Sequence, residues 1–290
     1  MKVPILSKYE AAIRIRLQEF LGRYLLRKHF LSRAFFRAMG ANGALIVGDF
    51  SDHRLAFRPG ENIGDNLLFK GEWQRDEIKR ALSFATRSSS FPKAAVFVDV
   101  GANNGTHTVY AMRSGHFVRA VSIEPEPENF RLLRMNLLLN DLEGDVTACR
   151  KAAGDVAGVA TLNLSGRHNS GGHTLLVTND AAGKIEVEVA RVDDILASAG
   201  TNPRDVGMVW IDAEGFEPQV IYGMPQIVAA GAPICLEFNV QRYDPKITTA
   251  LIGHLAKRYQ SWIMLRDENP VQMPIATLSN LGTSADIMIF

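Results

Sequence analysis

The segment from Val96 to Thr108, VFVDVGANNGTHT, contains the residues whose types and spacing best suit a binding site. An apolar run leads through it into a helical segment, and glycines at such a turn let the backbone approach a ligand closely. The spacing differs from GxGxxG, which argues against a nicotinamide dinucleotide. Asp99 could instead pair with the ammonium group of an amino-acid-like ligand such as S-adenosylmethionine, and a tight turn without a ligand is the alternative. The candidate cofactor-binding residues of this turn are Asp99, Gly101, Ala102, Asn103, Gly105 and Thr106.

A second candidate group ends the next apolar run. Ala120–Ile123 is followed by Glu124, 19 positions after Gly105, and then by Pro125. A carboxylate at the end of the second strand is placed to accept hydrogen bonds from both ribose hydroxyls of a nucleoside. A solvated acid is the alternative for Glu124 alone, but its combination with the glycine turn favours a cofactor site.

Carboxylates also follow the apolar run Val206–Ile211. If the ligand of the glycine turn is S-adenosylmethionine, transfer of its methyl group needs in-line positioning of the acceptor and a group that takes its proton. We expect Glu214 to orient or deprotonate a substrate hydroxyl. Asp212 is expected to contact the cofactor and to belong to the catalytic group, and Glu237 is expected to contact substrate. These three carboxylates could also bind Mg²⁺, which prefers oxygen ligands, but a metal is not expected. Glu217, before Pro218, is predicted to be an acid at a helix N-terminus.

A polar loop from Ser165 to Thr174, SGRHNSGGHT, is the remaining site candidate. It holds His168 and His173, and its glycines could let it fold over a cleft. A histidine with its usual pKa near 6.5 is a competent base for a hydroxyl. We predict a catalytic role for His173 and a substrate contact for His168, and a solvated hairpin loop is the alternative.

These residues would be positioned by a regular alternation of apolar runs and helical segments. Runs that are apolar at successive positions suit strands buried on both faces of a parallel sheet, and the alternation predicts a doubly wound α/β fold. Residues 158–191 are an insertion with two further strands, and a Gly/Asn-rich turn is expected at Gly60–Asn66. The predicted strands are Ala94–Val100, Ala120–Ile123, Val146–Ala148, Val206–Ile211, Pro233–Phe238, Trp262–Leu265 and Ile287–Phe290. The predicted helices are residues 8–39, Glu72–Ala85, Thr106–Ser114, Glu128–Leu139, Glu217–Ala229 and Lys246–Arg258.

The motifs together resemble the FkbM-type family of S-adenosylmethionine-dependent methyltransferases. The resemblance is carried by DVGANNG (Asp99–Gly105), Ile123–Pro125 and DAEGFE (Asp212–Glu217), with FKGEW (Phe69–Trp73) upstream. It implies the Rossmann-like class I methyltransferase fold, a seven-stranded, mostly parallel sheet with helices on both faces, whose last strand would be Asp286–Phe290. It also implies S-adenosyl-L-methionine as cofactor, with Lys151, Ala152 and Ala153 beside the adenine. Members mostly methylate hydroxyls of sugars or secondary metabolites.

Composition and charge divide the chain unevenly. The 290 residues carry a net charge of +1, yet residues 1–40 hold nine Lys/Arg and two Glu, and the rest has an excess of acids. We predict a basic amphipathic helical extension over 1–43, a cap region over 44–92 and a methyltransferase domain over 93–290. Residues 8–39 are expected to mediate packing or a homodimer, or peripheral contact with the inner membrane surface. The expected compartment is the cytoplasm.

Several functions compete with hydroxyl methylation. N-methylation, metal-assisted O-methylation and binding of S-adenosylmethionine without turnover are kept as alternatives. A nucleic-acid substrate is not expected, because the acidic body would repel phosphates. The expected partner is a small-molecule or glycan hydroxyl acceptor.

Overall fold

The computed structural model describes residues 29–88, 91–166 and 169–290. Its centre is an eight-stranded sheet in which β3, β4, β5, β9 and β10 run parallel and β13 runs antiparallel to both of its neighbours. Without the two-residue strand β12, this is the predicted seven-stranded, mostly parallel sheet. From one edge to the other the strands are β12 (Met273–Pro274), β11 (Ser261–Met264), β13 (Ala285–Ile289), β10 (Ile234–Phe238), β9 (Val206–Ile211), β3 (Val96–Val100), β4 (Arg119–Ile123) and β5 (Val146–Cys149).

The strand order reverses between β3 and β9. From β3 the chain adds β4 and then β5 on one side, and it later returns to add β9 and β10 on the other. In open α/β sheets, ligands bind beyond the carboxyl ends of the strands at such a switch point. The residues that follow β3, β4 and β9 are therefore brought to one place, as the sequence predicted.

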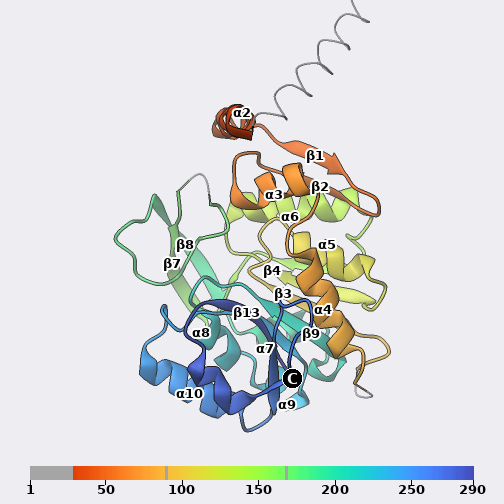
Figure 1. Cartoon of the computed structure of the whole chain (residues 1–290), viewed down its shortest axis with the longest axis vertical. Coiled ribbons are helices and arrows are strands. Elements are labelled where there is room, and N and C mark those ends of the chain that lie inside the picture. The colour runs from red at the N-terminus through yellow and green to blue at the C-terminus, as the bar shows by residue number, and fades with distance from the viewer. Residues whose placement is uncertain (1–28, 89–90, 167–168) are drawn as a thin grey trace, which may run out of the picture.

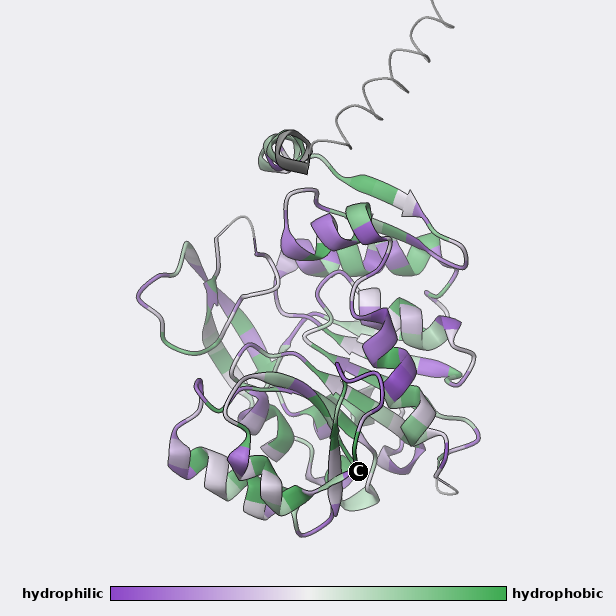
Figure 2. Cartoon of the chain, in the orientation of Figure 1, coloured by the Kyte–Doolittle hydropathy of each residue, from purple (hydrophilic) through white to green (hydrophobic). Residues whose placement is uncertain are grey.

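Helices lie on both faces of the sheet (Figure 1), and the side chains of each face pack into a hydrophobic core of their own. Successive side chains of a strand point to opposite faces, so Val96 and Val98 of β3 pack with one set of helices and Phe97 with the other. Figure 2 shows the apolar residues concentrated on these strands. On the Phe97 face lie α4 (Arg75–Ala85), α5 (Thr106–Arg113) and α6 (Pro127–Leu139). On the Val98 face lie α7 (Val192–Ser198), α8 (Glu217–Tyr222), α9 (Pro225–Ala230) and α10 (Pro245–Leu255).

The segment before the sheet packs on the Phe97 face. Asn136 of α6 accepts from the backbone N–H of Ala56 at 2.6 Å and donates to its carbonyl at 3.0 Å, as a neighbouring strand would. Leu55, Phe57 and Leu67 join the same core as Phe97. This region consists of α2 (His29–Ala41), β1 (Ile46–Asp49), β2 (Arg54–Phe57) and α3 (Asn62–Lys70).

Some expected elements were wrong in detail. Gly60–Asn66 was predicted as a turn, but residues 62–70 form α3, because Leu67 is buried and Gly71 ends the helix in a left-handed conformation. The single helix expected over Glu217–Ala229 is two helices, α8 and α9, and Pro225 begins the second. The helix expected over residues 8–39 is seen only as α2, and residues before 29 lie outside the described part of the chain.

The insertion forms a separate three-stranded sheet, β6 (Ala152–Ala153), β8 (Gly183–Ala190) and β7 (Gly158–Leu164). Its two long strands are those predicted, and the polar loop between them extends from Ser165 to Ala182. Across residues 29–88, 91–166 and 169–290, every helix is too short or too polar to cross a membrane.

Candidate active site

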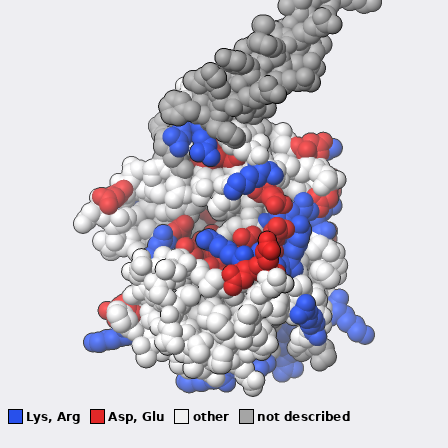
Figure 3. All heavy atoms as spheres, in the orientation of Figure 1, with Lys and Arg blue, Asp and Glu red and all other residues white. Residues whose placement is uncertain are grey.

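A cavity of about 960 Å³, its mouth included, lies beyond the carboxyl ends of β3, β4 and β9. Acidic and basic side chains gather in a band across the middle of the face shown in Figure 3. We call the residues from the β3, β4 and β5 ends the glycine side of the cavity; they are Gly101–Asn104, Thr106, Glu124, Pro125 and Lys151–Ala153. We call the other group the carboxylate side; its members are Trp73, His107, His173, Asp212 and Glu214.

Gly101 fixes the close approach of the two loops that follow β3 and β9. Its φ is 78°, in the left-handed region that favours glycine, and a Cβ there would overlap the carbonyl oxygen of Asp212. The backbone N–H groups of Gly101 and Ala102 donate to the carbonyl of Ile123 at 2.9 and 3.0 Å. The turn is thereby tied to both neighbouring strands. Gly105, also predicted here, is the left-handed N-cap of α5 and packs on Leu133 rather than lining the cavity.

Glu124 lines the cavity and also organises the turn. One carboxylate oxygen accepts from the backbone N–H of Asn103 at 2.8 Å and the other accepts from that of Glu126 at 2.9 Å. Burial raises the pKa of Glu124 to about 7. Each oxygen keeps a lone pair, so the carboxylate can still accept hydrogen bonds from a ligand.

Asp99 does not lie where the sequence placed it. Its side chain is fully buried on the Phe97 face of the sheet, where Thr108 of α5 donates to it, and it does not line the cavity. Alternation along β3 explains the difference, because the side chain of residue 99 points to the same face as that of residue 97. Burial raises its pKa to about 7. Asp99 therefore attaches α5 to β3, and its position does not support the predicted pairing with a ligand ammonium.

The segment predicted to flank an adenine does line the cavity. Ala152 and Ala153 form β6, and Leu162 and Phe216 add apolar surface beside them. Lys151 also lines the cavity, and its ammonium group pairs with Glu188 of β8. Small and apolar side chains here leave room for a flat ring.

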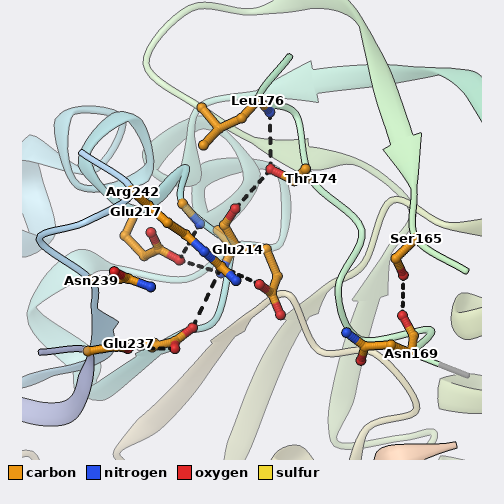
Figure 4. Close-up of polar contacts among 12 residues, drawn as sticks. Ser165, Asn169, Thr174, Leu176, Glu214, Glu217, Glu237, Asn239 and Arg242 are labelled. Carbon is orange, nitrogen blue, oxygen red and sulfur yellow. Dashed lines mark hydrogen bonds and ion pairs between the residues drawn. The ribbon is translucent and has the colours of Figure 1, made fainter. Parts of the chain in front are cut away.

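Arg242, which no sequence motif indicated, places a positive charge beside the carboxylates of Glu214 and Glu237 (Figure 4). Its guanidinium donates to Glu214 and lies 3.8 Å from a carboxylate oxygen of Glu237. Burial raises the pKa of Glu214, and the positive charge of Arg242 opposes that shift. Glu237 accepts from Ser284 at 2.7 Å and does not line the cavity, so its predicted contact with substrate is not supported by its position.

Asp212 differs from Glu214 in having no such partner. Its carboxylate makes no hydrogen bond to any residue that the structure describes, and it lines the cavity. Burial and the neighbouring carboxylates of Glu214, Glu217 and Glu237 raise its pKa well above the ordinary value. A carboxylate with a raised pKa and no internal partner is the better proton acceptor, so the contacts favour Asp212 over the predicted Glu214.

The three acids Asp212, Glu214 and Glu237 offer oxygen atoms within 4.8 Å of one another, as a divalent cation would need. The guanidinium of Arg242 already supplies positive charge to two of them.

Glu217 was expected to be an acid at a helix N-terminus, and it is the first residue of α8. Its carboxylate holds the loop that follows β9 through hydrogen bonds. It accepts from the backbone N–H groups of Ala213 and Gly215, both at 3.1 Å, and from the Tyr243 hydroxyl at 2.7 Å.

Within the predicted loop, residues 169–171 and His173 line the cavity. Asn129 of α6 donates to the carbonyl of Ser170 at 2.9 Å, and the Thr174 hydroxyl donates to the carbonyl of Glu214 at 2.8 Å. His173 lines the cavity, and burial lowers its pKa. Its Nδ1 accepts from the backbone N–H of Ser165 at 3.0 Å, so the ring proton is on Nε2. His173 can therefore donate to a ligand, whereas the predicted base role would require that bond to break. His168 lies outside the described residues.

Two further lining residues belong to sequence motifs that indicated no chemical role for them. Trp73 ends FKGEW, and His107 is the second residue of α5. Their positions in the cavity could not be inferred, because they depend on how α4 and α5 pack. Arg242 had no sequence signal, since it acts through contacts with distant acids.

Comparisons with known proteins identify the family to which the chain is similar. Residues 99–265 match the model of the methyltransferase FkbM domain. The 31-O-demethyl-FK506 methyltransferase FkbM of Streptomyces tacrolimicus is 31% identical over 158 residues, which cover 44% of this chain and 59% of that protein. Methyltransferase sdnD of Sordaria araneosa is 25% identical over 166 residues, or 48% of this chain and 63% of its own length. The matched segments thus span about three fifths of these curated relatives.

A solved structure, the methyltransferase FkbM of Methylobacillus flagellatus KT, aligns with 16% identity and a TM-score of 0.43, covering 69% of this chain and 44% of that one. The family model covers more than half of the chain, from the end of β3 to the end of β11. The chain therefore belongs to the FkbM methyltransferase family.

Proposed function

We propose that the protein is an S-adenosylmethionine-dependent methyltransferase that methylates a hydroxyl group of a sugar, a glycan or a secondary metabolite. The observation that carries the proposal is that the Gly101 turn, Glu124 and the carboxylate of Asp212, which has no hydrogen bond within the described chain, line the same cavity. Membership of the family and the names of the relatives support methyl transfer, and the acceptor is inferred from the cavity and from the family resemblance.

The glycine side fits the cofactor. The absence of a Cβ at Gly101 lets the loops that follow β3 and β9 approach closely, and Glu124 remains able to accept hydrogen bonds from ribose hydroxyls. Lys151, Ala152 and Ala153 would lie along the adenine. When bound, S-adenosylmethionine supplies a methyl group on a positively charged sulfur.

The carboxylate side would do the chemistry at the acceptor. Asp212 would accept the hydroxyl proton as the oxygen–carbon bond forms and the sulfur–carbon bond breaks. The carboxylates of Asp212 and Glu214 also provide negative potential for a cationic cofactor. His173 would donate from Nε2 to the acceptor, and residues 169–173 would exclude water.

Carboxylate, imidazole and indole side chains around the cavity are suited to a hydroxylated acceptor. Trp73 offers an apolar ring face, and Asn62 and Asn169 offer amide groups that can donate and accept. A polar acceptor that carries several hydroxyls could pair with these groups, whereas an apolar acceptor would cover them on binding without replacing their hydrogen bonds to water.

Two measurements test the proposal. Titration calorimetry of the full chain with S-adenosylmethionine, and separately with NAD, is expected to show binding of the first alone. Transfer of the labelled methyl group to a panel of methyl glycosides (glucoside, rhamnoside and fucoside) is then expected to yield methyl ethers. Binding of NAD in place of S-adenosylmethionine would overturn the cofactor assignment. Binding without transfer to glycosides, but with transfer to amines, would overturn the hydroxyl assignment.

A further inference from the structure

His107 is a cavity residue that the proposed chemistry does not use. It is 6% exposed, it lines the cavity, and its ring centre lies 4.6 Å from that of Trp210 with the planes inclined by 39°. The two ring nitrogens of a neutral histidine differ, because one donates and the other accepts, so the role of His107 depends on which nitrogen carries the proton.

Three linked hydrogen bonds determine which nitrogen of His107 is protonated. Arg266 donates from Nε to a carboxylate oxygen of Asp286 at 2.9 Å, and the Gln74 amide nitrogen donates to the same oxygen at 3.2 Å. This fixes the orientation of the amide, whose oxygen faces Nε2 of His107 at 3.0 Å. An amide oxygen only accepts hydrogen bonds, so Nε2 carries the proton.

Nδ1 of His107 is then the unprotonated nitrogen. It makes no hydrogen bond within the described chain, and it is not among the buried polar atoms that lack a partner, so it retains accessible surface. Burial lowers the pKa of the ring to about 3, which keeps it neutral at physiological pH. The cavity therefore holds two histidines in opposite forms, because His173 presents a donor and His107 an acceptor.

We propose that Nδ1 of His107 accepts a hydrogen bond from the acceptor hydroxyl, and that Gln74 and Asp286 are positioning residues that fix its tautomer. The inference rests on the proposed function, since it names a contact of the same site. Such a contact selects groups that carry a proton, because an unmade hydrogen bond to a buried polar group is costly. The methyl ether product has no proton to donate, so the same contact disfavours its retention. A hydroxyl carries one proton, so the bond to Nδ1 holds the acceptor while it binds. The hydroxyl then turns this proton toward Asp212, the stronger base, which takes it as the oxygen–carbon bond forms and the sulfur–carbon bond breaks.

The tautomer can be observed without any acceptor. We would label the histidines of the full chain with ¹⁵N, record long-range ¹⁵N–¹H spectra and assign His107 by its loss in His107→Phe. The expected spectrum shows protonated Nε2 and bare Nδ1, unchanged between pH 6 and 8. In Gln74→Leu, a second tautomer with a proton on Nδ1 is expected to appear. A protonated Nδ1 in the unsubstituted protein would overturn the inference, whatever the outcome of the transfer assays.

The acceptor contact is tested with the methyl glycoside of the panel that is methylated fastest. His107→Phe keeps a ring against Trp210 but removes the acceptor nitrogen, and we expect kcat/KM for the glycoside to fall by about ten- to a hundredfold. S-adenosylmethionine affinity is expected to stay within about twofold. His107→Asn, which retains an acceptor near Nδ1, should recover much of the loss, and exposed His116→Asn is the control. Equal kcat/KM in His107→Phe and His116→Asn would overturn the contact.

The two proposals fail in different ways. Absence of S-adenosylmethionine binding in the calorimetry would refute the proposed function, while the tautomer spectrum would be unaffected. Normal binding and transfer, combined with a protonated Nδ1 or an unaffected His107→Phe variant, would refute only the further inference.

Discussion

The two sides of the cavity are built in different ways. On the glycine side, one continuous segment after β3 supplies half of the residues, and its contacts run largely through the backbone, as when Gly101 and Ala102 donate to Ile123. On the carboxylate side, the groups are side chains from distant segments, and Trp73, His173 and Asp212 come together only in the folded chain. The first arrangement depends on local backbone geometry, and the second depends on how loops pack.

This difference has a consequence for substitutions. A change in the glycine turn alters the backbone that the whole site shares, because Gly101 contacts the loop that carries Asp212. A change on the carboxylate side alters one functional group and leaves the scaffold in place. The expected effects therefore decrease from the turn outward.

Gly101→Ala is expected to have the largest effect. The residue has a φ of 78°, and the added Cβ would overlap the Asp212 carbonyl, so the β3 and β9 loops must separate. We expect a loss of about 3 kcal/mol in the free energy of unfolding and a fall of more than about a hundredfold in S-adenosylmethionine affinity. Chemical denaturation and calorimetry measure the two quantities.

Gly115→Ala is the matched control for Gly101→Ala. Its φ of 74° is similar, but no atom lies within 4 Å of the Cβ position, so only the backbone cost of about 1 kcal/mol is expected. Affinity should stay within about twofold. Equal losses of stability and affinity in both variants would show that the left-handed backbone conformation, and not the contact between the loops, requires glycine at position 101.

Asp212→Asn compared with Glu214→Gln tests which carboxylate takes the proton. Because Asp212 has no internal partner and Glu214 pairs with Arg242, we expect kcat to fall about 10²- to 10³-fold for the first variant and about tenfold or less for the second. Steady-state kinetics with the best methyl glycoside measure both. A larger loss for Glu214→Gln would restore the role that the sequence assigned to Glu214.

The same contrast explains how much could be predicted from the sequence. Gly101, Asn103 and Glu124 were found correctly as lining residues, because a turn between a strand and a helix has local requirements that short motifs record. The seven-stranded sheet was also predicted correctly, since buried strands such as Val206–Ile211 are apolar at every position.

The direction of individual side chains and the contacts between distant residues could not be predicted from the sequence. The motif included Asp99, but the direction of its side chain follows from strand alternation, which places it under α5. The Arg242 pair and the Gln74–His107 bond join residues far apart in the chain, and no spacing rule connects them. The base role expected of His173 depended on a tautomer that only the Ser165 contact reveals.

The pH dependence of cofactor binding separates two acids with similar pKa values. Burial raises the pKa of both Glu124 and Asp99 to about 7, but only Glu124 lines the cavity. A carboxylate accepts hydrogen bonds from ribose hydroxyls better than a neutral carboxyl group does. Affinity for S-adenosylmethionine is therefore expected to rise about tenfold as the pH increases through 7. Calorimetry should show that Glu124→Gln removes this rise and that Asp99→Asn preserves it.

Stability should respond to both acids alike. A buried acid whose pKa is raised binds more protons in the folded state than in the unfolded state between its ordinary value near 4 and about 7. The free energy of unfolding of the unliganded protein is thus expected to fall as the pH rises through that window. Asp99→Asn and Glu124→Gln should each make the fall shallower, and an unchanged slope in both would contradict the assigned shifts.

Arg242→Gln is expected to have the smallest effect, and it acts on charge alone. The side chain is 41% exposed, so its ion pair contributes little to folding, and the free energy of unfolding should change by less than about 1 kcal/mol. The positive charge lowers the pKa of Glu214, so its removal should raise that pKa further. The part of the kcat/KM profile that depends on Glu214, and that is absent in Glu214→Gln, should then move to higher pH, whereas Arg242→Lys should keep most of the original profile. A profile that is unchanged in Arg242→Gln would mean that the carboxylate side owes its charge balance to the cofactor rather than to this arginine.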